Sequence, residues 1–476
     1  MIKTKYILFL ALLIANTFTA AAQESAHFIG SWAGKLDVGG GLRIVFHIKD
    51  NGSGGLRTTA DSPDQSAFGM KCDTTFVAAG TLTIEIREVN ASYTARLQGD
   101  SALDGVLKQG MELPLILKKA GTQPTARKRP QQPVPPFPYK IEDVEYDNAD
   151  RSLHYGATIT IPDGKGPFPA VVLISGSGAQ NRDGEMMGHK SFVVLGDALS
   201  RNGFVVLRVD DRGVGKSSGR FSQASSADFA DDVRVSLDYL LSRPEVDRKK
   251  TGLLGHSEGG MIAPIAAAQR NDIDFIVLLG APGIKISELM EEQNRQLYRQ
   301  AGMSQRAIDA YMSLYKATNE TVMASTDTAA ALKQVRSQIK DWAASTDTSL
   351  LRELKLDAVQ SQDELAKGIV GTLSTKWYRY FLAFDPAPYL QKLKCKVLAL
   401  NGEKDVQVVA GPNLAGIEAA LKKSKSKTYE VKQLPGLNHL FQTCRTCTPS
   451  EYAQLEETFS PLALDEINKW LNKNVK

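Results

Sequence analysis

The chain has 476 residues, more than one hydrophobic core of ordinary size needs, so we expect more than one structural unit. Hydrophobic residues make up 42% and charged residues 23% of the sequence, a composition that is typical of globular proteins and excludes an intrinsically disordered chain. The formal net charge is only +4, and such a near balance recruits neither nucleic acid nor an acidic membrane surface.

Residues 1–22 have the three parts of a cleaved signal peptide. Two lysines precede an apolar run over residues 6–14, which is too short to span a bilayer, and three alanines end the segment at Ala22. The first cysteine is Cys72, so the predicted cleavage site has no cysteine for a lipid anchor. No later segment is apolar enough to span a membrane. We therefore expect a mature protein that is periplasmic or secreted.

Residues 23–120 predict a small all-β domain. Short runs such as Leu42 to Ile48 and Thr81 to Ile86 alternate between apolar and polar side chains, and glycine-rich turns such as Asn51-Gly52 separate them. This pattern favours antiparallel strands. Nothing in it indicates what the domain binds.

Residues 121–138 predict a linker between two domains. The segment contains six of the chain's 20 prolines, a composition that favours extended geometry. It also contains the basic triplet Arg127 to Arg129. We interpret the triplet as a solvated face of the linker and not as a nucleic-acid patch.

Residues 139–476 predict a mostly parallel α/β sheet with helices on both faces. Their apolar runs lack alternation, as strands covered on both faces do, and helical stretches separate the early runs. The runs are Ala170 to Ile174, Phe204 to Leu207, Gly252 to Leu254, Phe275 to Leu279 and Val397 to Leu400.

A helical insertion is predicted between the last two of these runs, at about residues 285–385. No proline occurs between Pro282 and Pro386, and no glycine between Gly302 and Gly368. In an enzyme, an insertion at this place would lie over the site as a cap.

The segment Gly255 to Gly259, with sequence Gly-His-Ser-Glu-Gly, follows the buried strand that ends at Leu254. Glycines two positions before and after Ser257 allow a strained strand-to-helix turn that exposes the serine hydroxyl. We therefore predict that Ser257 is a nucleophile. The alternative is a tight structural turn.

A serine nucleophile needs a histidine base, and the chain contains six histidines. In enzymes whose serine lies in such a strand-to-helix turn, the catalytic residues occur in the chain order serine, acid, histidine. His439 follows the last predicted strand, which is where this order places the base. His256 is expected to point away from Ser257, because adjacent residues in such a turn face opposite ways. His189 follows a predicted strand and remains an alternative.

The acid of the triad should follow a strand between Ser257 and His439. Asp405 lies directly after the run that ends at Leu400, and Glu403 is the alternative. A carboxylate on a surface turn is the other interpretation of either residue.

Two backbone N–H groups should bind the oxyanion of an acyl transfer. We expect them from Glu258, which follows the nucleophile, and from Ser177 in the turn Ser175 to Gln180. The segment 213–217 resembles a phosphate-binding loop, but the position that needs glycine is Asp210, so we interpret it as a structural turn.

Cys444 and Cys447 lie shortly after His439. In an oxidising compartment a local disulfide is favoured, and two free thiols are the alternative. Zinc would need four ligands, and Cys72 and Cys395 lie far away in the sequence. No spaced set of ligands predicts a metal or another cofactor.

The order of motifs from about residue 139 onward resembles the α/β-hydrolase superfamily. These motifs lie at residues 175–183, 210–217, 255–259, 401–405 and 438–441. More narrowly, the chain resembles the EstD-type bacterial carboxylesterases, which also have a β-rich N-terminal region. The resemblance implies an α/β-hydrolase fold in which Ser257, Asp405 and His439 are the nucleophile, acid and base. Serine peptidases of the prolyl-oligopeptidase and proline-iminopeptidase types have the same motifs.

We therefore expect a serine-dependent hydrolase that cleaves small carboxylic esters through an acyl-enzyme intermediate. A peptidase or aminopeptidase is the alternative, and it would need a carboxylate in the cap to hold a substrate amine. The residues available for that role are Glu288, Glu291, Glu292 and Asp309. A third alternative is an envelope- or glycan-binding protein with an inactive hydrolase body. The sequence does not indicate the acyl and alcohol specificity or the oligomeric state.

Overall fold

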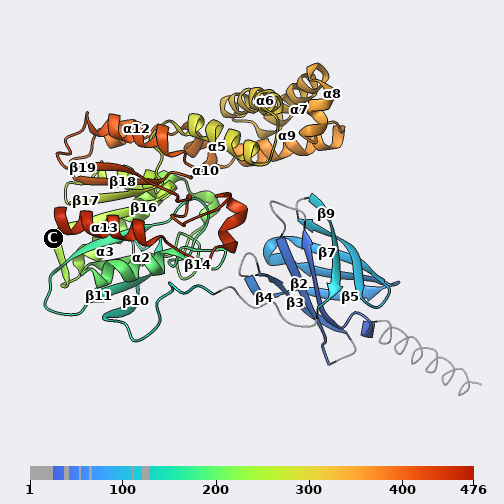
Figure 1. Ribbon diagram of the computed structural model, residues 1–476, viewed down its shortest axis with the longest axis horizontal. Coiled ribbons are helices and arrows are strands. Elements are labelled where there is room, and N and C mark those ends of the chain that lie inside the picture. Colours follow the sequence, from blue (N-terminus) through green and yellow to red (C-terminus); the bar gives the residue numbers. More distant parts are fainter. Residues whose placement is uncertain (1–24, 37–41, 53–54, 64–66, 110, 121–127) are drawn as a thin grey trace, which may run out of the picture. The chain divides into compact units, whose positions relative to one another are not determined.

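The computed structural model describes residues 25–476 except 37–41, 53–54, 64–66, 110 and 121–127. The predicted signal peptide and the first part of the predicted linker lie outside the described residues. The chain divides into two compact units (Figure 1): one comprises residues up to Lys128 together with 186–188, and the other comprises the remainder from Arg129 to Lys476.

The first unit is an antiparallel β-sheet, as the alternating pattern predicted. Within the described residues its strands are β1 (Gly30–Leu36), β2 (Leu42–Asp50), β3 (Leu56–Ser62), β4 (Ala67–Lys71), β5 (Thr74–Ala78), β6 (Thr81–Ile86), β7 (Ala91–Gln98), β8 (Ala102–Gln109) and β9 (Met111–Lys119). They pair in the order β4-β3-β2-β1-β9-β8-β7-β6-β5. β4 and β5 lie at opposite ends of this order although two residues separate them in the chain, so the sheet must curl until its edges approach each other.

The first unit has a hydrophobic core of its own. Along β6, the side chains of Leu82, Ile84 and Ile86 are buried while those between them are half-buried. Trp32 and Tyr93 are completely buried in the same cluster. A separate core of this kind is what allows a segment to fold as a domain.

The second unit contains a mostly parallel sheet. Within the described residues its strands pair in the order β10-β11-β15-β12-β16-β17-β18-β19. Their bounds are β10 (Tyr139–Asp147), β11 (His154–Pro162), β12 (Phe168–Ile174), β15 (Val205–Val209), β16 (Val246–His256), β17 (Phe275–Leu279), β18 (Lys396–Gly402) and β19 (Tyr429–Leu434). The pairs β10·β11 and β11·β15 are antiparallel, and the other pairs are parallel. The five apolar runs correspond to β12, β15, β16, β17 and β18, which confirms the predicted sheet.

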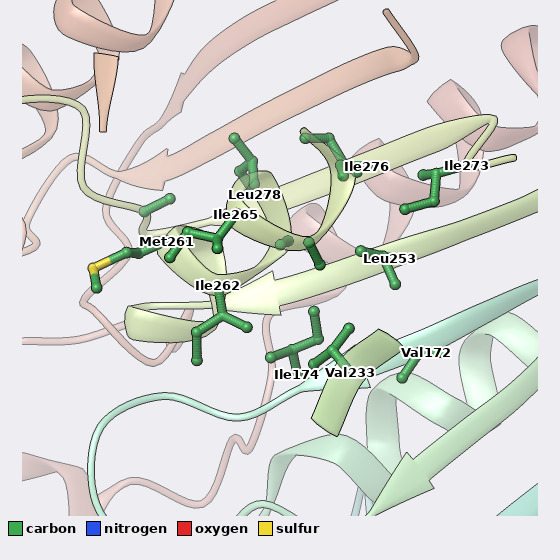
Figure 2. Packing of buried hydrophobic residues seen from close by; sticks show 14 of the residues in the cluster. Val172, Ile174, Val233, Leu253, Met261, Ile262, Ile265, Ile273, Ile276 and Leu278 are labelled. Atoms are coloured by element: carbon green, nitrogen blue, oxygen red, sulfur yellow. The ribbon is translucent and has the colours of Figure 1, made fainter. Parts of the chain in front are cut away.

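Helices cover both faces of this sheet. One face packs against α3 (Ser226–Ser242), α4 (Glu258–Ala267) and α12 (Ala410–Leu421), and the other against α2 (Ser191–Arg201) and α13 (Pro461–Asn474). Val172 and Ile174 of β12 face the first set, while Val171 and Leu173 face the second. Figure 2 shows part of the packing on the first face, where side chains of α3 and α4 lie against strands of the sheet. Because both faces are covered, the strands have no polar alternation.

The predicted helical insertion lies between β17 and β18. Its helices are α5 (Ile286–Gln300), α6 (Gln305–Ala324), α7 (Thr328–Ser345), α8 (Thr348–Glu353), α9 (Val359–Leu373), α10 (Lys376–Ala383) and α11 (Ala387–Leu390). Leu314, Val335 and Val370 belong to a small cluster formed by the insertion itself. Phe381 of α10 instead belongs to the cluster on the sheet. Ile286 and Leu289 of α5 and Leu390 of α11 belong to the same cluster. The insertion therefore has its own core and is joined to the sheet through α10 and through its two ends, α5 and α11.

The described part of the predicted linker, residues 128–138, contains no helix or strand. The expectation of a solvated basic face is wrong for Arg129, because its guanidinium donates to the carbonyl oxygens of Leu455 (2.6 Å) and Ala453 (3.0 Å). Gln131 likewise donates to the carbonyl oxygen of Phe459 at 2.7 Å. This segment therefore packs on the C-terminal part of the second unit.

Gly283, which follows β17, approaches α12 so closely that no side chain fits. A Cβ atom at this position would lie 1.8 Å from the carbonyl oxygen of Asn413. We expect Gly283→Ala to lower the free energy of unfolding by about 1–3 kcal/mol, as overpacking does. Urea denaturation measures the change. Gly371→Ala is the matched control, because Gly371 lies in α9 with open space around it and alanine should stabilise that helix by about 0.5–1 kcal/mol. An equal decrease in the free energy of unfolding of both variants would contradict the prediction.

Candidate active site

Ser257 lies in the sharp turn between β16 and α4, with φ 56° and ψ −120°. A positive φ is uncommon for a residue with a side chain, and such backbone strain costs about 1–3 kcal/mol. The N–H of Ser257 donates to the carbonyl oxygen of Leu279 in β17 at 2.8 Å, which helps to hold the turn. This is the strand-to-helix geometry that the sequence predicted.

The two glycines that flank Ser257 have no room for a side chain. A Cβ atom at Gly255 would lie 2.0 Å from the carbonyl oxygen of Gly259. A Cβ atom at Gly259 would lie 2.3 Å from the carbonyl oxygen of Ile174 at the end of β12. The prediction that side chains two positions from the serine would collide is confirmed.

A hydrogen-bond chain connects Ser257, His439 and Asp405. Nε2 of His439 lies 3.0 Å from Oγ of Ser257, and Nδ1 lies 2.7 Å from Oδ2 of Asp405. The side chains of His439 and Asp405 are 5% and 0% exposed, whereas Ser257 is half-buried. The structure thus brings together the three residues chosen from the sequence, with a buried carboxylate at one end and a more accessible hydroxyl at the other.

The loop after β18 aims the carboxylate of Asp405 at the imidazole. Oδ1 accepts from the backbone N–H groups of Gln407 and Val408, both at 2.8 Å, and Oδ2 faces His439. Glu403, the alternative acid, is turned elsewhere, because its Oε2 accepts from the N–H of Gly436 at 3.0 Å. Asp405 is therefore the carboxylate that the structure places beside His439.

The other two histidines considered from the sequence have different partners. His189 is buried beneath the C-terminal segment, where Nδ1 lies 2.9 Å from Oγ1 of Thr458 and Nε2 lies 2.9 Å from the carbonyl oxygen of Tyr452. Burial lowers the pKa of His189 to about 4. The ring of His256 turns to the backbone of His439, and its Nε2 donates to that carbonyl oxygen at 2.8 Å.

His256 and Gly280 both contact His439, and neither contact was predicted from the sequence. Burial, with the nearby imidazole of His439 as a second cause, lowers the pKa of His256 to about 3. His256 is therefore neutral at ordinary pH and supports the histidine loop by donating a hydrogen bond. Gly280 has φ 57°, and a Cβ atom there would lie 3.3 Å from Nδ1 of His439. Nothing in the sequence indicated these two contacts, because each joins segments that are far apart in the chain.

The turn Ser175 to Gln180 passes directly beside the serine. A Cβ atom at Gly176 would lie 3.1 Å from Cβ of Ser257. Among the hydrogen bonds that the described residues form, none has the backbone N–H of Ser177 or of Glu258 as donor. The two amides expected to bind an oxyanion therefore flank Ser257 without a protein acceptor.

The side chain of Glu258 is a second feature that sequence reasoning missed. It is 2% exposed, and its Oε1 accepts from Oγ of Ser226 at 2.6 Å and from Nε1 of Trp377 at 2.8 Å. The side chain of Ser177 also hydrogen-bonds to it. Burial raises the pKa of Glu258, and these hydrogen bonds oppose the increase. Glu258 thus joins α3, α10 and the turn that contains Ser177.

The loop after His439 is braced by covalent and polar contacts. Cys444 and Cys447 form a disulfide, as predicted, so they are neither zinc ligands nor free thiols. The carboxylate of Glu451 accepts from the backbone N–H groups of Cys447 at 2.7 Å, Thr446 at 2.9 Å and Arg445 at 3.1 Å. Burial raises the pKa of Glu451, but these hydrogen bonds outweigh it and hold the pKa below its usual value.

The turn that resembles a phosphate-binding loop is filled by a side chain. The carboxylate of Asp210 accepts from the guanidinium of Arg182 at 2.6 Å and from the backbone N–H groups of Arg182 and Lys216. A Cβ atom at Gly215 would lie 2.4 Å from Oδ2 of Asp210. The interpretation as a structural turn is confirmed.

In the described part of the chain, no three histidine, cysteine, aspartate or glutamate side chains gather as ligands for a metal ion. None of the helices described there is long and apolar enough to cross a membrane. Cys72 and Cys395 are free thiols, and burial raises the pKa of each to about 12.

Comparison with protein families finds one match across the site. The family described as serine aminopeptidase, S33, matches residues 186–443, which is more than half of the chain and includes Ser257, Asp405 and His439.

Individual proteins are similar over different lengths. Esterase EstD of Thermotoga maritima is 26% identical over 340 residues, which cover 71% of this chain and 70% of that protein. Human dipeptidyl peptidase 8 is 32% identical over 121 residues, which cover 24% of this chain and 13% of that protein. Among solved structures, an esterase of Pyrococcus furiosus is 14% identical, with a TM-score of 0.42, over 71% of this chain and 92% of that one.

We expect the stability of the protein to fall, relative to that of Glu258→Gln, as the pH rises above 4.5. Because the folded-state pKa of Glu258 is raised above 4.5, the folded protein binds this proton more tightly than the unfolded chain, and that advantage is lost as the pH rises through the folded pKa. Glutamine does not titrate. Urea denaturation of both proteins across a pH series measures the difference, with Glu288→Gln, exposed on α5, as control. A difference that does not change with pH would contradict the prediction.

Proposed function

This chain belongs to the family described as serine aminopeptidase, S33, and we propose that within this family it hydrolyses carboxylic esters with Ser257 as the nucleophile. The observation that carries the proposal is the hydrogen-bond chain from Asp405 through His439 to Oγ of Ser257. The similarity to Esterase EstD supports an ester as the substrate, because it extends over 71% of the chain, whereas the similarity to dipeptidyl peptidase 8 covers 24%.

The first half of the reaction acylates the enzyme. Nε2 of His439 takes the proton of Ser257 as Oγ attacks the carbonyl carbon of the ester, and the carbonyl oxygen becomes an oxyanion. The carboxylate of Asp405 holds the Nδ1 proton of His439 and stabilises the imidazolium that forms. His439 then gives its proton to the leaving alcohol, which leaves the acyl group on Ser257.

The second half removes the acyl group with water. His439 takes a proton from the water molecule, the resulting hydroxide attacks the acyl carbon, and Oγ of Ser257 recovers its proton on release of the acid. In both halves, the N–H groups of Ser177 and Glu258 donate to the oxyanion. Donors that are already in position need no rearrangement as the charge develops, which makes this electrostatic contribution large.

The helices between β17 and β18 act in this proposal as a cap over the site. Supporting this role, Nε1 of Trp377 in α10 donates to Glu258, the residue next to the nucleophile. Phe381, one turn later, packs into the cluster on the sheet beside α4. A cap anchored so close to Ser257 would determine which acyl and alcohol groups reach the serine.

A peptidase of the same family is the second candidate function, and the family's description favours it. Of the carboxylates that could hold a substrate amine in the cap, Asp309 is paired with Arg295 at 2.6 Å, and Glu292 accepts from Gln296 at 2.7 Å. Glu258, which is closer to Ser257, is buried and already accepts hydrogen bonds. Glu288 and Glu291, the other two carboxylates named from the sequence, form no salt bridge or side-chain hydrogen bond with the described residues, so the choice of an ester rests on the similarity to Esterase EstD.

The proposal includes a periplasmic or secreted location. Its support is the signal-peptide pattern of residues 1–22 and the Cys444–Cys447 disulfide, since disulfides persist in oxidising compartments.

We expect the purified protein to cleave short-chain chromogenic esters and to leave aminoacyl and dipeptidyl anilides intact. Ser257→Ala should lose roughly 10⁴–10⁶-fold in kcat, because removal of the nucleophile disables the whole triad. Ser337→Ala, at an exposed position of α7, is the matched control and should remain active. Anilide cleavage that depends on Ser257 would favour the peptidase. If Ser257 is needed for the cleavage of neither substrate, the result would favour a binding protein with an inactive hydrolase body.

We expect Trp377→Phe to lower kcat/KM for esters by about 2- to 12-fold, which corresponds to the loss of one hydrogen bond. The phenyl ring keeps most of the packing but cannot donate to Glu258. Trp342→Phe is the matched control, because Nε1 of Trp342 donates to the carbonyl oxygen of Ala310 within the insertion itself. Equal kinetics of Trp377→Phe and the wild type would show that this contact does not act on the reaction.

A further inference from the structure

Asp211 lies in the turn after β15 and contacts the turn Ser175 to Gln180 near both of its ends. Its Oδ1 accepts from Oγ of Ser175 at 2.6 Å, and its Oδ2 accepts from the backbone N–H of Gln180 at 2.9 Å. The N–H of Asp211 in turn donates to the carbonyl oxygen of Gln180 at 3.1 Å. Ser177, with the amide expected to bind the oxyanion, lies between these two anchor points.

The same turn is packed tightly against the nucleophile. The carbonyl oxygen of Ser175 lies 2.6 Å from where a Cβ atom of Gly259 would be, and a Cβ atom at Gly176 would lie 3.1 Å from Cβ of Ser257. A small displacement of Ser175 or Gln180 therefore changes the position of the Ser177 amide relative to Oγ of Ser257. In an enzyme, a displacement of about 1 Å at the reacting groups can cost 10²-fold in rate.

Asp211 has no cation beside it among the described residues, unlike its two neighbours in the chain and their partners. Of its neighbours in the chain, Asp210 is paired with Arg182 at 2.6 Å, and Arg212 is paired with Asp232 of α3 at 2.7 Å. Within the described residues, no salt bridge includes Asp211. Its ionised form is held by donors that carry no charge.

The groups that face Asp211 oppose its ionisation. Burial is the largest cause, and the carboxylates of Glu258 on α4 and Asp232 on α3 add to it, so that the pKa of Asp211 is raised to about 7 despite the hydrogen bonds from Ser175 and Gln180. The hydroxyl of Tyr155 in β11 donates to Asp232 and not to Asp211. A cavity of about 50 Å³ that Asp211, Ser175 and Gly176 line has room for water, which provides a route for the proton.

We propose that Asp211 is a positioning residue for ester hydrolysis, whose ionised carboxylate holds the turn Ser175 to Gln180 so that the amide of Ser177 meets the oxyanion. This inference rests on the proposed function of the site. When Asp211 is protonated, one of its oxygens becomes a donor, so it no longer accepts from both Ser175 and Gln180. The oxyanion amide is then poorly placed, and activity falls as Asp211 becomes protonated.

The test is the pH profile of ester hydrolysis by the wild type and by Asp211→Asn, whose amide cannot accept at both atoms. At the alkaline plateau, we expect Asp211→Asn to lower kcat by about 10- to 100-fold with KM within about twofold, the pattern of a lost transition-state interaction. On the acid side, a plot of log(kcat/KM) against pH should be steeper for the wild type than for Asp211→Asn, because the variant lacks the carboxyl group that binds a proton.

Two further variants separate positioning from folding. Ser175→Ala removes one of the two anchors, and the double variant with Asp211→Asn should be little worse than Asp211→Asn alone, because both act through the same turn. Asp238→Asn, which changes an exposed carboxylate paired with Arg270 on the surface, should match the wild type in activity and pH profile. Thermal unfolding of each variant shows whether it is folded.

Wild-type kcat in Asp211→Asn, or an acid limb as steep as that of the wild type, would overturn the proposal. Additive effects of Ser175→Ala and Asp211→Asn would overturn it as well, and if Asp211→Asn does not fold, an unchanged kcat in Ser175→Ala would overturn it. Failure of the proposed function itself is distinct, because ester hydrolysis by the wild type would then be absent or would persist in Ser257→Ala.

Discussion

The rest of the structure depends on the close approach of three chain segments at Ser257. The end of β12, the end of β17 and the start of α4 meet there, and the carbonyl oxygens of Ile174 and Ser175 occupy the space that a side chain at Gly259 would need. The strained backbone of Ser257 persists because its N–H is bonded to Leu279 and its neighbours are packed on every side. Since β12, β16 and β17 are adjacent parallel strands, their carboxyl ends bring Ser257 and the two amides proposed to bind the oxyanion to one edge of the sheet.

Buried carboxylates surround this turn, and most of them are satisfied without a cation. Asp405, Glu258 and Asp211 accept from backbone N–H groups, from hydroxyls or from ring N–H groups, whereas Asp210 and Asp232 are paired with arginines. A buried charge costs several kcal/mol unless hydrogen bonds offset it, so each of these acceptors needs its donors in fixed positions. The polar network that surrounds Ser257 therefore also determines the shape of the turn that carries Ser177.

The helical insertion is attached to this network through the hydrogen bond from Trp377 of α10 to Glu258. It has its own small core, in which α6, α7 and α9 pack together, and α10 joins it to the sheet and to Glu258. An insertion built in this way can differ in shape without disturbing the strand-to-helix turn, because the turn is held by β12, β17 and α4. The first unit likewise has a core of its own.

The sequence by itself determined the features whose signals are local. Apolar runs marked the parallel strands, alternation marked the first unit, and the glycines around Ser257 marked the turn, because each of these depends on residues close together in the chain. Chain order then indicated Asp405 and His439, and the structure places His439 within hydrogen-bond distance of both Asp405 and Ser257. Only the tertiary structure decided between Asp405 and Glu403, since both follow the same strand and differ in which way they turn. It alone also revealed the contacts of His256, Gly280, Glu258 and Asp211. Their partners lie on other segments, and the sequence does not show which groups a carboxylate or a histidine will contact after folding.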